Sequence, residues 1–267
     1  MIGMDWLVVD SRYKPAFERL RLNSFSRVVD FFSGKGDPNR RALVQQKQVQ
    51  LSDGSSLPVF YKQYEFARSS WRYLWRASKA RCEFQSYGVF EQFGIPCAER
   101  IACGEQRDWL GRLCRAFIVT KALPNAGNLV EFVQKFCPGR ATAELRRMRA
   151  RLLDQLAVLT RRMHLAKFFH HDLVWRNILV EFAPNEPKLW FIDCPRGQFD
   201  RWSPLQHRRR LKDLGSLDKS AAKYCSWTER LRFVKLYLGK KRLDAATKQL
   251  VRDTLEYRRR RWPDDWP

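Results

Sequence analysis

The chain has 267 residues with an apolar fraction of 45%, which suits one large or two-lobed domain with a packed core and argues against disorder. Its net charge of +23 predicts a polyanionic partner, such as nucleic acid, an anionic membrane surface or a phosphorylated glycolipid. The seven cysteines lack C-x-x-C spacing, which argues against a zinc site or a disulfide framework, and no apolar stretch is long enough to cross a membrane.

The first part of the chain reads as an antiparallel sheet. The residue pattern predicts strands over 25–32, 42–51 and 57–64. Glycine, serine and aspartate mark turns between them at 33–38 and 52–56. Connections this short join neighbouring antiparallel strands, so we expect the three strands to pair in one sheet.

A helix over 77–93 is predicted next, because apolar residues recur there at broadly helical spacing. Gly94-Ile95-Pro96 is expected to end it, since glycine and proline are typical of helix ends. Two more strands, at 101–103 and 113–120, complete the β-rich part of the chain.

The rest of the chain reads as mostly helical. Its clearest element spans 144–165, where leucine and methionine at steps of three and four line one face. A short strand pair at 178–182 and 189–192 follows, and the tail from residue 204 is again helical.

This order predicts an α+β fold of two lobes. The N-lobe, residues 1–122, carries the sheet and one helix, and the larger helical C-lobe takes residues 123–267. A cleft between two such halves of one domain is a natural ligand site.

The strongest chemical signal follows the long helix. Asp172 and Asn177 stand five residues apart, and Asp193 ends the second strand of the pair. The short hairpin between them would bring Asn177 and Asp193 together, and a carboxylate with an amide oxygen suits Mg²⁺ that carries phosphates. Asp172 would then face an acceptor hydroxyl. The alternative is that Asp172 caps a helix.

The order of these residues matches the protein-kinase layout, in which H-R-D-x-x-x-x-N precedes a metal-binding aspartate. Here His170-His171-Asp172 stands where His-Arg-Asp is usual, and Asp193-Cys194-Pro195 stands where Asp-Phe-Gly is usual. The metal-binding aspartate is kept and the Phe-Gly switch is absent. The pattern therefore argues against regulation by a flipping phenylalanine and against a typical protein kinase.

Two upstream features fit the same chemistry. Lys62 lies in the third predicted strand, where a kinase lysine would contact the α- and β-phosphates, and Glu83 on the next helix is the candidate partner. An edge-strand lysine that prevents aggregation is the alternative for Lys62. Gly34 and Gly36 lie in the first turn, where backbone N–H groups could approach phosphates; an ordinary hairpin turn explains them equally well.

These residues resemble the lipopolysaccharide kinase family known as Kdo/WaaP. The resemblance runs from about Arg27 to about Tyr224 and depends on the order and spacing of several short segments. The most specific segments are Tyr61-Lys62, Glu83 to Pro96, His171-Asp172 with Asn177, Ile192-Asp193 followed by Arg196, and Lys212 to Leu217.

The resemblance implies a bilobal protein-kinase-like fold and phosphate transfer from ATP to a Kdo or heptose hydroxyl of the lipopolysaccharide inner core. In the family's pattern Lys62 binds phosphate, and Glu83 orients that lysine. Asp172 is the catalytic base, while Asn177 and Asp193 bind Mg²⁺. The adenine would lie near Lys121-Ala122-Leu123, and Asp213 would brace the catalytic loop. A carboxylate at a helix N-terminus is the other interpretation of Asp213. Arg196 binds an anionic substrate group or pairs with an acidic neighbour.

The charge has a use in this setting, because inner-core sugars and lipid A carry anionic groups that arginine binds well. The basic runs at 208–210, 240–242 and 258–261 are expected to lie against an anionic membrane as a peripheral contact; solvated surface is the alternative. The N-terminus does not read as a secretory signal, so we expect a cytoplasmic protein, at the inner membrane. Nucleic acid is not expected, and the oligomeric state is left open.

Two other functions stay open at this level. An aminoglycoside- or choline-kinase-like phosphotransferase shares the H-x-D-x-x-x-x-N layout, although it does not need so large a positive charge. A noncatalytic pseudokinase-like module would bind anionic glycolipid without turning over ATP, and the altered Asp193-Cys194-Pro195 segment keeps that possibility open.

Overall fold

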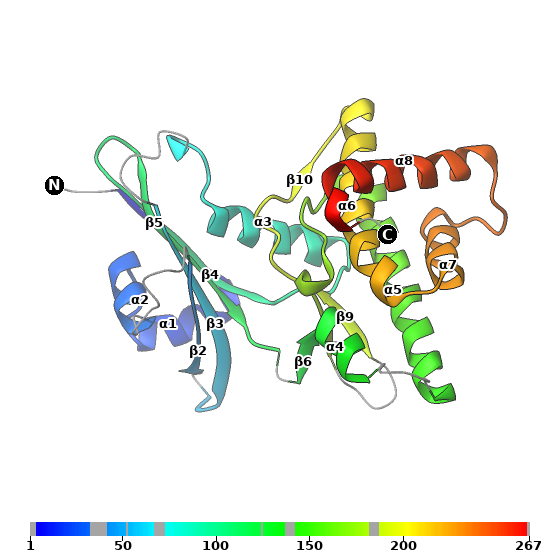
Figure 1. Cartoon of the computed structure of the whole chain (residues 1–267). Helices are drawn as coiled ribbons and strands as arrows, with labels where there is room; N and C mark the ends of the chain where they lie inside the picture. The colour runs from blue at the N-terminus through cyan, green and yellow to red at the C-terminus, as the bar shows by residue number, and fades with distance from the viewer. Residues whose placement is uncertain are drawn as a thin grey trace. The chain divides into compact units, whose positions relative to one another are not determined.

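The structure, a computed structural model, describes residues 4–32, 42–51, 53–66, 73–123, 125–136, 142–181 and 187–265. The chain folds into two compact units (Figure 1). The first comprises Met1–Val89 and Ala98–Leu123, and the second comprises Phe90–Cys97 and Pro124–Pro267.

A five-stranded antiparallel sheet forms the centre of the first unit, in the order β1-β4-β5-β3-β2. The strands are β1 (Met4–Val9), β2 (Ala42–Gln50), β3 (Ser56–Glu65), β4 (Arg100–Arg107) and β5 (Leu113–Lys121). The strands predicted after residue 41 are thereby confirmed. The first strand, β1, was not predicted from the sequence, and it pairs with the distant β4.

The strand predicted over 25–32 is wrong: Phe25–Phe32 is the helix α2. Its apolar residues Phe25, Val28, Val29 and Phe32 recur at steps of three and four, which places them on one face of a helix. All four are buried. A short 3₁₀ turn (Ser11–Tyr13) and the helix α1 (Lys14–Arg19) precede it.

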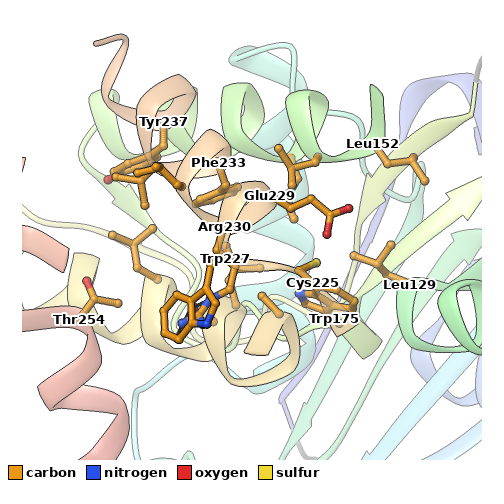
Figure 2. Close-up of a pocket in the computed structure, with 18 of the residues that line it drawn as sticks. Leu129, Leu152, Trp175, Cys225, Trp227, Glu229, Arg230, Phe233, Tyr237 and Thr254 are labelled. Carbon is orange, nitrogen blue, oxygen red and sulfur yellow. Dashed lines mark hydrogen bonds and ion pairs between the residues drawn. The ribbon is translucent and has the colours of Figure 1, made fainter. Parts of the chain in front are cut away.

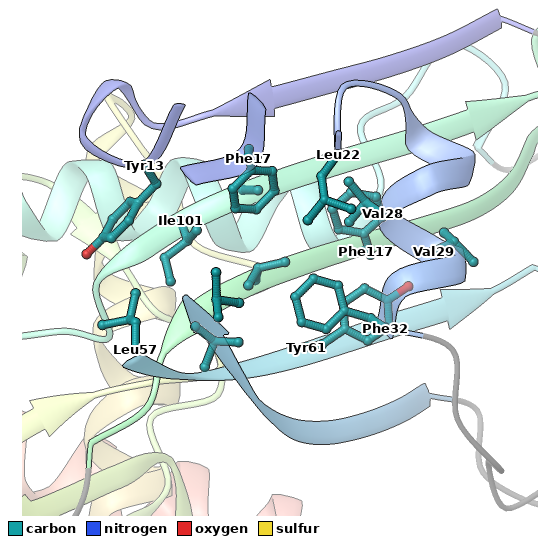
Figure 3. Close-up of a cluster of buried hydrophobic side chains, with 14 of the residues drawn as sticks. Tyr13, Phe17, Leu22, Val28, Val29, Phe32, Leu57, Tyr61, Ile101 and Phe117 are labelled. Atoms are coloured by element: carbon teal, nitrogen blue, oxygen red, sulfur yellow. The ribbon is translucent and has the colours of Figure 1, made fainter. Parts of the chain in front are cut away.

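The core of the first unit lies between these helices and one face of the sheet (Figure 3). Alternation along β3 sends Leu57, Val59 and Tyr61 into it. The ring of Tyr61 stacks on Phe32 of α2, with ring centroids 4.7 Å apart. Because alternate residues point to opposite faces, Lys62 and Tyr64 face away from this core.

The helix predicted over 77–93 is confirmed as α3 (Lys79–Gln92). The backbone N–H of Ser78, just before it, donates to the buried Glu105 carboxylate at 2.6 Å, which satisfies one of the N–H groups at the helix start. Gly94 follows the helix with a φ of 60°, the left-handed conformation that glycine adopts most readily, so the predicted stop is also confirmed.

The second unit is mainly helical, with small antiparallel sheets ordered β6-β8-β9 and β10-β7. Its elements are β6 (Ala126–Asn128), α4 (Leu129–Phe136), α5 (Ala143–Leu165), β7 (Phe168–Phe169), β8 (Ile178–Glu181), β9 (Lys188–Phe191), β10 (Gln198–Phe199), α6 (Ser203–Tyr224), α7 (Trp227–Leu238) and α8 (Ala245–Arg261), with 3₁₀ turns at Trp175–Asn177 and Pro263–Asp265. The predicted long helix, strand pair and helical tail are confirmed. No helix among the described residues has the length and apolar character needed to cross a bilayer.

Candidate active site

In the first unit the structure brings Lys62 and Glu83 together. Lys62 Nζ lies 3.3 Å from Glu83 Oε2, so strand β3 and helix α3 are joined by this ion pair. β3 is an inner strand between β5 and β2, which excludes the alternative of an edge-strand lysine. The lysine side chain keeps 22% of its surface exposed, whereas that of Glu83 is almost fully buried.

Two tyrosines also donate hydrogen bonds to Glu83. Tyr87 donates to Oε1 at 2.8 Å, and Tyr64 donates to Oε2 at 3.2 Å. The ammonium of Lys62 also lies 5.3 Å from the centre of the Tyr64 ring. A buried carboxylate with its oxygens satisfied holds a fixed position, so Glu83 fixes the direction of the lysine beside it. These tyrosines were not predicted from the sequence, where their signal is the spacing: Tyr64 is the second residue after Lys62, and Tyr87 is the fourth after Glu83.

In the second unit, the loop after β7 carries Asp172 and the 3₁₀ turn that ends at Asn177. The side-chain amide of Asn177 donates to the backbone carbonyl of Asp172 at 2.9 Å. The backbone N–H of Ile192 donates to the carbonyl of Asn177 at 3.0 Å, which places Asn177 beside the chain that leads into Asp193. The three residues that the sequence singled out therefore lie in one place.

The left-handed backbone conformation occurs at both ends of this group. His171 has a φ of 65° and Asp193 a φ of 55°. Residues other than glycine take this conformation at a cost, and such positions cluster at functional sites. Cys194, where protein kinases have phenylalanine, is fully buried with its thiol 3.8 Å from the His170 carbonyl. Cysteine is much smaller than phenylalanine, so this position has no bulky side chain that could flip in and out of a pocket.

Asp213 holds the backbone of this loop. Its Oδ2 accepts from the N–H of His170 at 2.9 Å, and its Oδ1 accepts from the N–H of His171 at 2.8 Å. Asp213 is fully buried and lies well inside α6, so it is not a carboxylate at a helix N-terminus. Burial alone would raise the pKa of Asp213, but the hydrogen bond from His164 helps to lower it overall.

The network continues to α7 through two residues that sequence reasoning missed. His164, at the end of α5, has Nε2 3.3 Å from Asp213 Oδ2 and Nδ1 2.8 Å from the Tyr237 hydroxyl. With its proton on Nε2, the ring donates to Asp213 and accepts from Tyr237. Both side chains are buried. The position of Asp213 therefore depends on α5 and α7 as well as on its own helix.

Burial also sets the charge state of the loop. It lowers the pKa of His170, and it lowers that of His171 to about 4, so both rings are neutral near pH 7. Lys212, next to Asp213, has a pKa lowered chiefly by burial. The Nδ1 atom of His170 and the Nε2 atom of His171 have no hydrogen-bond partner among the described residues. The two rings therefore add no positive charge to the buried side of the loop near pH 7.

The segment predicted to contact adenine, Arg196 and the two glycines lie in different parts of the chain. Lys121 ends β5 and its ammonium lies 3.5 Å from Glu99; Ala122 beside it is buried, and Leu123 is half-buried. Arg196 is exposed in the turn after Asp193. Gly34 and Gly36 lie outside the described residues.

The donor set suits a hard cation that carries phosphate. Because Asn177 uses its amide nitrogen on the Asp172 carbonyl, its oxygen is the atom left for a metal, and Asp193 adds a carboxylate. No group of three or more histidine, cysteine, aspartate or glutamate residues that could hold a metal occurs in the described ranges. Two oxygen donors fit Mg²⁺, which takes its remaining ligands from phosphates and water.

An apolar cavity of about 220 Å³ lies among the helices of the second unit (Figure 2). Its walls include Phe132 of α4, Leu152 of α5, Leu217 of α6, and Phe233 and Tyr237 of α7. The charged residues on its wall are paired with one another. Arg149 lies 3.0 Å from Glu229, and Arg230 lies 2.7 Å from Asp218. The interior is therefore left to aliphatic and aromatic side chains.

An antiparallel sheet with a helix-borne carboxylate beside a strand lysine, followed by a helical unit with an aspartate–asparagine–aspartate group, defines a protein-kinase-like fold. A solved structure described as "WaaP in complex with acyl carrier protein" has this fold. It superposes with a TM-score of 0.72 at 22% identity, over 98% of this chain and 100% of that one.

The chain belongs to the lipopolysaccharide kinase (Kdo/WaaP) family, whose sequence profile matches residues 34–237. It is 30% identical over 147 residues to a 3-deoxy-D-manno-octulosonic acid kinase of Haemophilus influenzae (strain 86-028NP), covering 53% of this chain and 56% of that protein. A protein of the same name from Actinobacillus succinogenes (strain ATCC 55618 / DSM 22257 / CCUG 43843 / 130Z) is 28% identical over 138 residues, or 51% of this chain and 52% of its own. The chain thus spans about half the length of the curated relatives it matches.

Proposed function

We propose that this protein transfers the γ-phosphoryl group of ATP to a sugar hydroxyl, of heptose or Kdo, in the lipopolysaccharide inner core. The observation that carries the proposal is the group of Asp172, Asn177 and Asp193, in a loop whose backbone is held by the buried Asp213. Membership of the family supports the sugar acceptor. The reaction belongs in the cytoplasm, where ATP is available.

Each residue has a part in the proposed mechanism. Asp172 orients the acceptor hydroxyl and takes its proton as the oxygen attacks phosphorus. Lys62, held by Glu83, neutralises charge on the nucleotide phosphates, and Asn177 with Asp193 would hold Mg²⁺, which supplies further neutralisation when bound. Lys121 to Leu123 would contact the adenine. Catalysis then rests on positioning and electrostatics, since phosphoryl transfer requires little covalent chemistry from the protein.

The first test compares lipopolysaccharide from cells that carry the native chain and cells that carry Asp172→Ala. We expect ³¹P NMR with mass spectrometry to show the loss of one inner-core phosphate in the variant, and the fragment masses to identify the sugar. Arg176→Ala, an exposed change in the same turn, is the control and should leave the phosphate in place. An unchanged core in the Asp172→Ala cells would refute the assignment and direct attention to another small-molecule acceptor.

A second part of the proposal concerns a partner. We propose that an acyl carrier protein presents its acyl chain to the apolar cavity of the second unit. Two observations support this: the superposed WaaP structure contains an acyl carrier protein, and the cavity wall is apolar with its charged residues paired. An acyl chain gains free energy from such a site at about 0.8 kcal/mol for each buried CH₂ group.

Thermal unfolding of the whole chain with acylated and unacylated carrier protein tests this pairing. A ligand that binds only the folded state raises stability by about 2.7 kcal/mol at one hundred times its Kd, so the acylated form should raise the midpoint and the unacylated form should not. Val234→Trp, which reduces the cavity, should abolish the difference. Equal shifts from both forms would contradict the acyl site.

A further inference from the structure

A group of exposed apolar side chains lies beside the catalytic loop. Leu165 is 67% exposed, Phe199 50%, Trp202 74% and Leu205 41%. Large apolar side chains are common on protein surfaces one at a time, but a gathered set marks an interaction site. With the exposed cations between them they form what we name the apolar–basic patch: Leu165, Lys167, Arg196, Phe199, Arg201, Trp202, Leu205 and Arg208.

The two segments that carry the patch, 165–169 and 196–208, are hydrogen-bonded to each other. β10 pairs with β7, so that Phe199 lies opposite Phe168, and the two rings are 5.1 Å apart. The backbone N–H of Asp200 donates to the carbonyl of Lys167 at 2.9 Å. Residues from the end of α5 and from the start of α6 therefore present their side chains from one hydrogen-bonded piece of chain.

The exposed tryptophan stands on a fixed support. Asp200 is buried, its Oδ1 accepts from the backbone N–H of Trp202 at 3.0 Å, and its Oδ2 pairs with Arg209 at 2.9 Å. The side chain of Gln206 donates to the Asp200 carbonyl at 3.0 Å. Exposure of Trp202 thus belongs to an ordered part of the fold, and its presentation to a partner costs little conformational entropy.

The charge of the patch has one sign. Between Leu165 and Phe169, and between Arg196 and Arg208, the single carboxylate is Asp200, which is buried and already paired with Arg209. Within the described part of the chain, Arg201 and Arg208 form no ion pair. Their charge is therefore available to an external anion.

The basic runs near the C-terminus differ, because acidic neighbours take up much of their charge. Arg258 is buried and pairs with Asp218 at 3.0 Å, Lys240 pairs with Asp244, and Arg260 pairs with Glu256. Of the run 258–261, which was predicted to lie against an anionic membrane, Arg258 is buried and so does not present its charge at the surface. Of the basic runs, the one at the start of α6 has exposed apolar side chains beside it.

We propose that the apolar–basic patch docks on an anionic phospholipid bilayer. Tryptophan and leucine would enter the headgroup region, where aromatic rings partition well, while arginine and lysine bind lipid phosphates. The inference rests on the proposed function in one respect, which is that a lipopolysaccharide acceptor is anchored in a membrane. β7 leads directly to the loop that carries Asp172, and Asp193 directly precedes the turn of Arg196, so the docked face would lie next to the catalytic group.

Sedimentation with vesicles tests the patch without any turnover, so its outcome is separate from that of the kinase assignment. The whole chain is mixed with vesicles of phosphatidylethanolamine and phosphatidylglycerol, or of phosphatidylcholine alone. We expect binding to the anionic vesicles to exceed binding to the neutral ones and to weaken with salt. Trp202→Ser with Leu205→Ser should weaken binding to the anionic vesicles by about tenfold or more, since each exposed anchor contributes an apolar transfer term.

The matched control is Trp109→Ser, which changes a tryptophan that is 62% exposed in the first unit. It should bind like the native chain, and thermal unfolding should confirm that all variants fold. Arg201→Gln with Arg208→Gln should weaken binding and flatten its salt dependence. Unchanged binding in both double variants would overturn the proposal. The proposal would also be overturned if the native chain sedimented as a dimer and the double variants as monomers while vesicle binding stayed intact, because the patch would then be an interface between copies.

Discussion

The two units differ in what their buried carboxylates hold. Glu83 in the first unit accepts hydrogen bonds from the side chains of Lys62, Tyr64 and Tyr87. Asp213 in the second unit receives two consecutive backbone N–H groups as well as the His164 ring. The first carboxylate fixes one lysine side chain, whereas the second fixes the path of the chain. Damage to Asp213 should therefore spread through the loop, and damage around Glu83 should stay local.

The largest effect that separates the two carboxylates is expected for Asp213→Ala. It leaves buried N–H donors without an acceptor, and we expect the free energy of unfolding to fall by roughly 3–5 kcal/mol, because each unsatisfied buried donor costs about 1–3 kcal/mol. Urea unfolding measures this. Asp253→Ala, a partly exposed change in α8, is the control and should stay within about 0.5 kcal/mol. A small loss for Asp213→Ala would mean that the loop is held by other contacts.

Lys62→Met, in contrast to Asp213→Ala, should reduce activity and leave stability almost unchanged. We expect phosphate transfer to fall on the order of a hundredfold, as for the loss of one electrostatic contact in a transition state, while the unfolding midpoint changes little. The side chain is partly exposed, so its removal leaves no large buried void. Steady-state kinetics and thermal unfolding on the same preparation check both halves. Near-normal turnover would remove Lys62 from the proposed site.

Tyr237→Phe tests how far the network of Asp213 extends. The change removes the hydroxyl that donates to His164 Nδ1 at 2.8 Å, and we expect a loss of about 1 kcal/mol in the free energy of unfolding. Turnover should fall by a few fold while the KM for ATP is unchanged, because Tyr237 acts through the loop. A changed KM with unchanged turnover would contradict this positioning role.

The smallest effect concerns acid stability, and the units differ here because all four histidines lie in the second one. Burial lowers the pKa of His171 to about 4, whereas an unfolded histidine has a pKa near 6.5. The unfolded chain binds more protons between these values, so stability should fall as the pH drops from about 6.5 to about 4. His171→Gln should reduce this slope in unfolding titrations, and the exposed His207→Gln should not.

The sequence predicted the local elements well where one period was clear. β3 alternates in its first half, the long helix α5 repeats every three to four residues, and Gly94 ends α3 as expected. It failed at 25–32, where a short apolar run was assigned to a strand although its spacing fits the helix α2. It also missed β1, because nothing in a short apolar stretch indicates the strand β4 with which it pairs.

In the candidate site too, some features were predictable from the sequence and others depended on the tertiary structure. The sequence by itself predicted which residues would offer oxygen ligands and charge, because the spacing of Asp172, Asn177 and Asp193 is a property of the chain. The tertiary structure decided between the two interpretations of Asp213, and it alone showed that Tyr237, 73 residues after His164, supports the loop through that histidine. Backbone conformation and the burial of one face of an element depend on residues close together in the sequence. The partners of a buried polar group, in contrast, come from distant segments that meet only when the core forms.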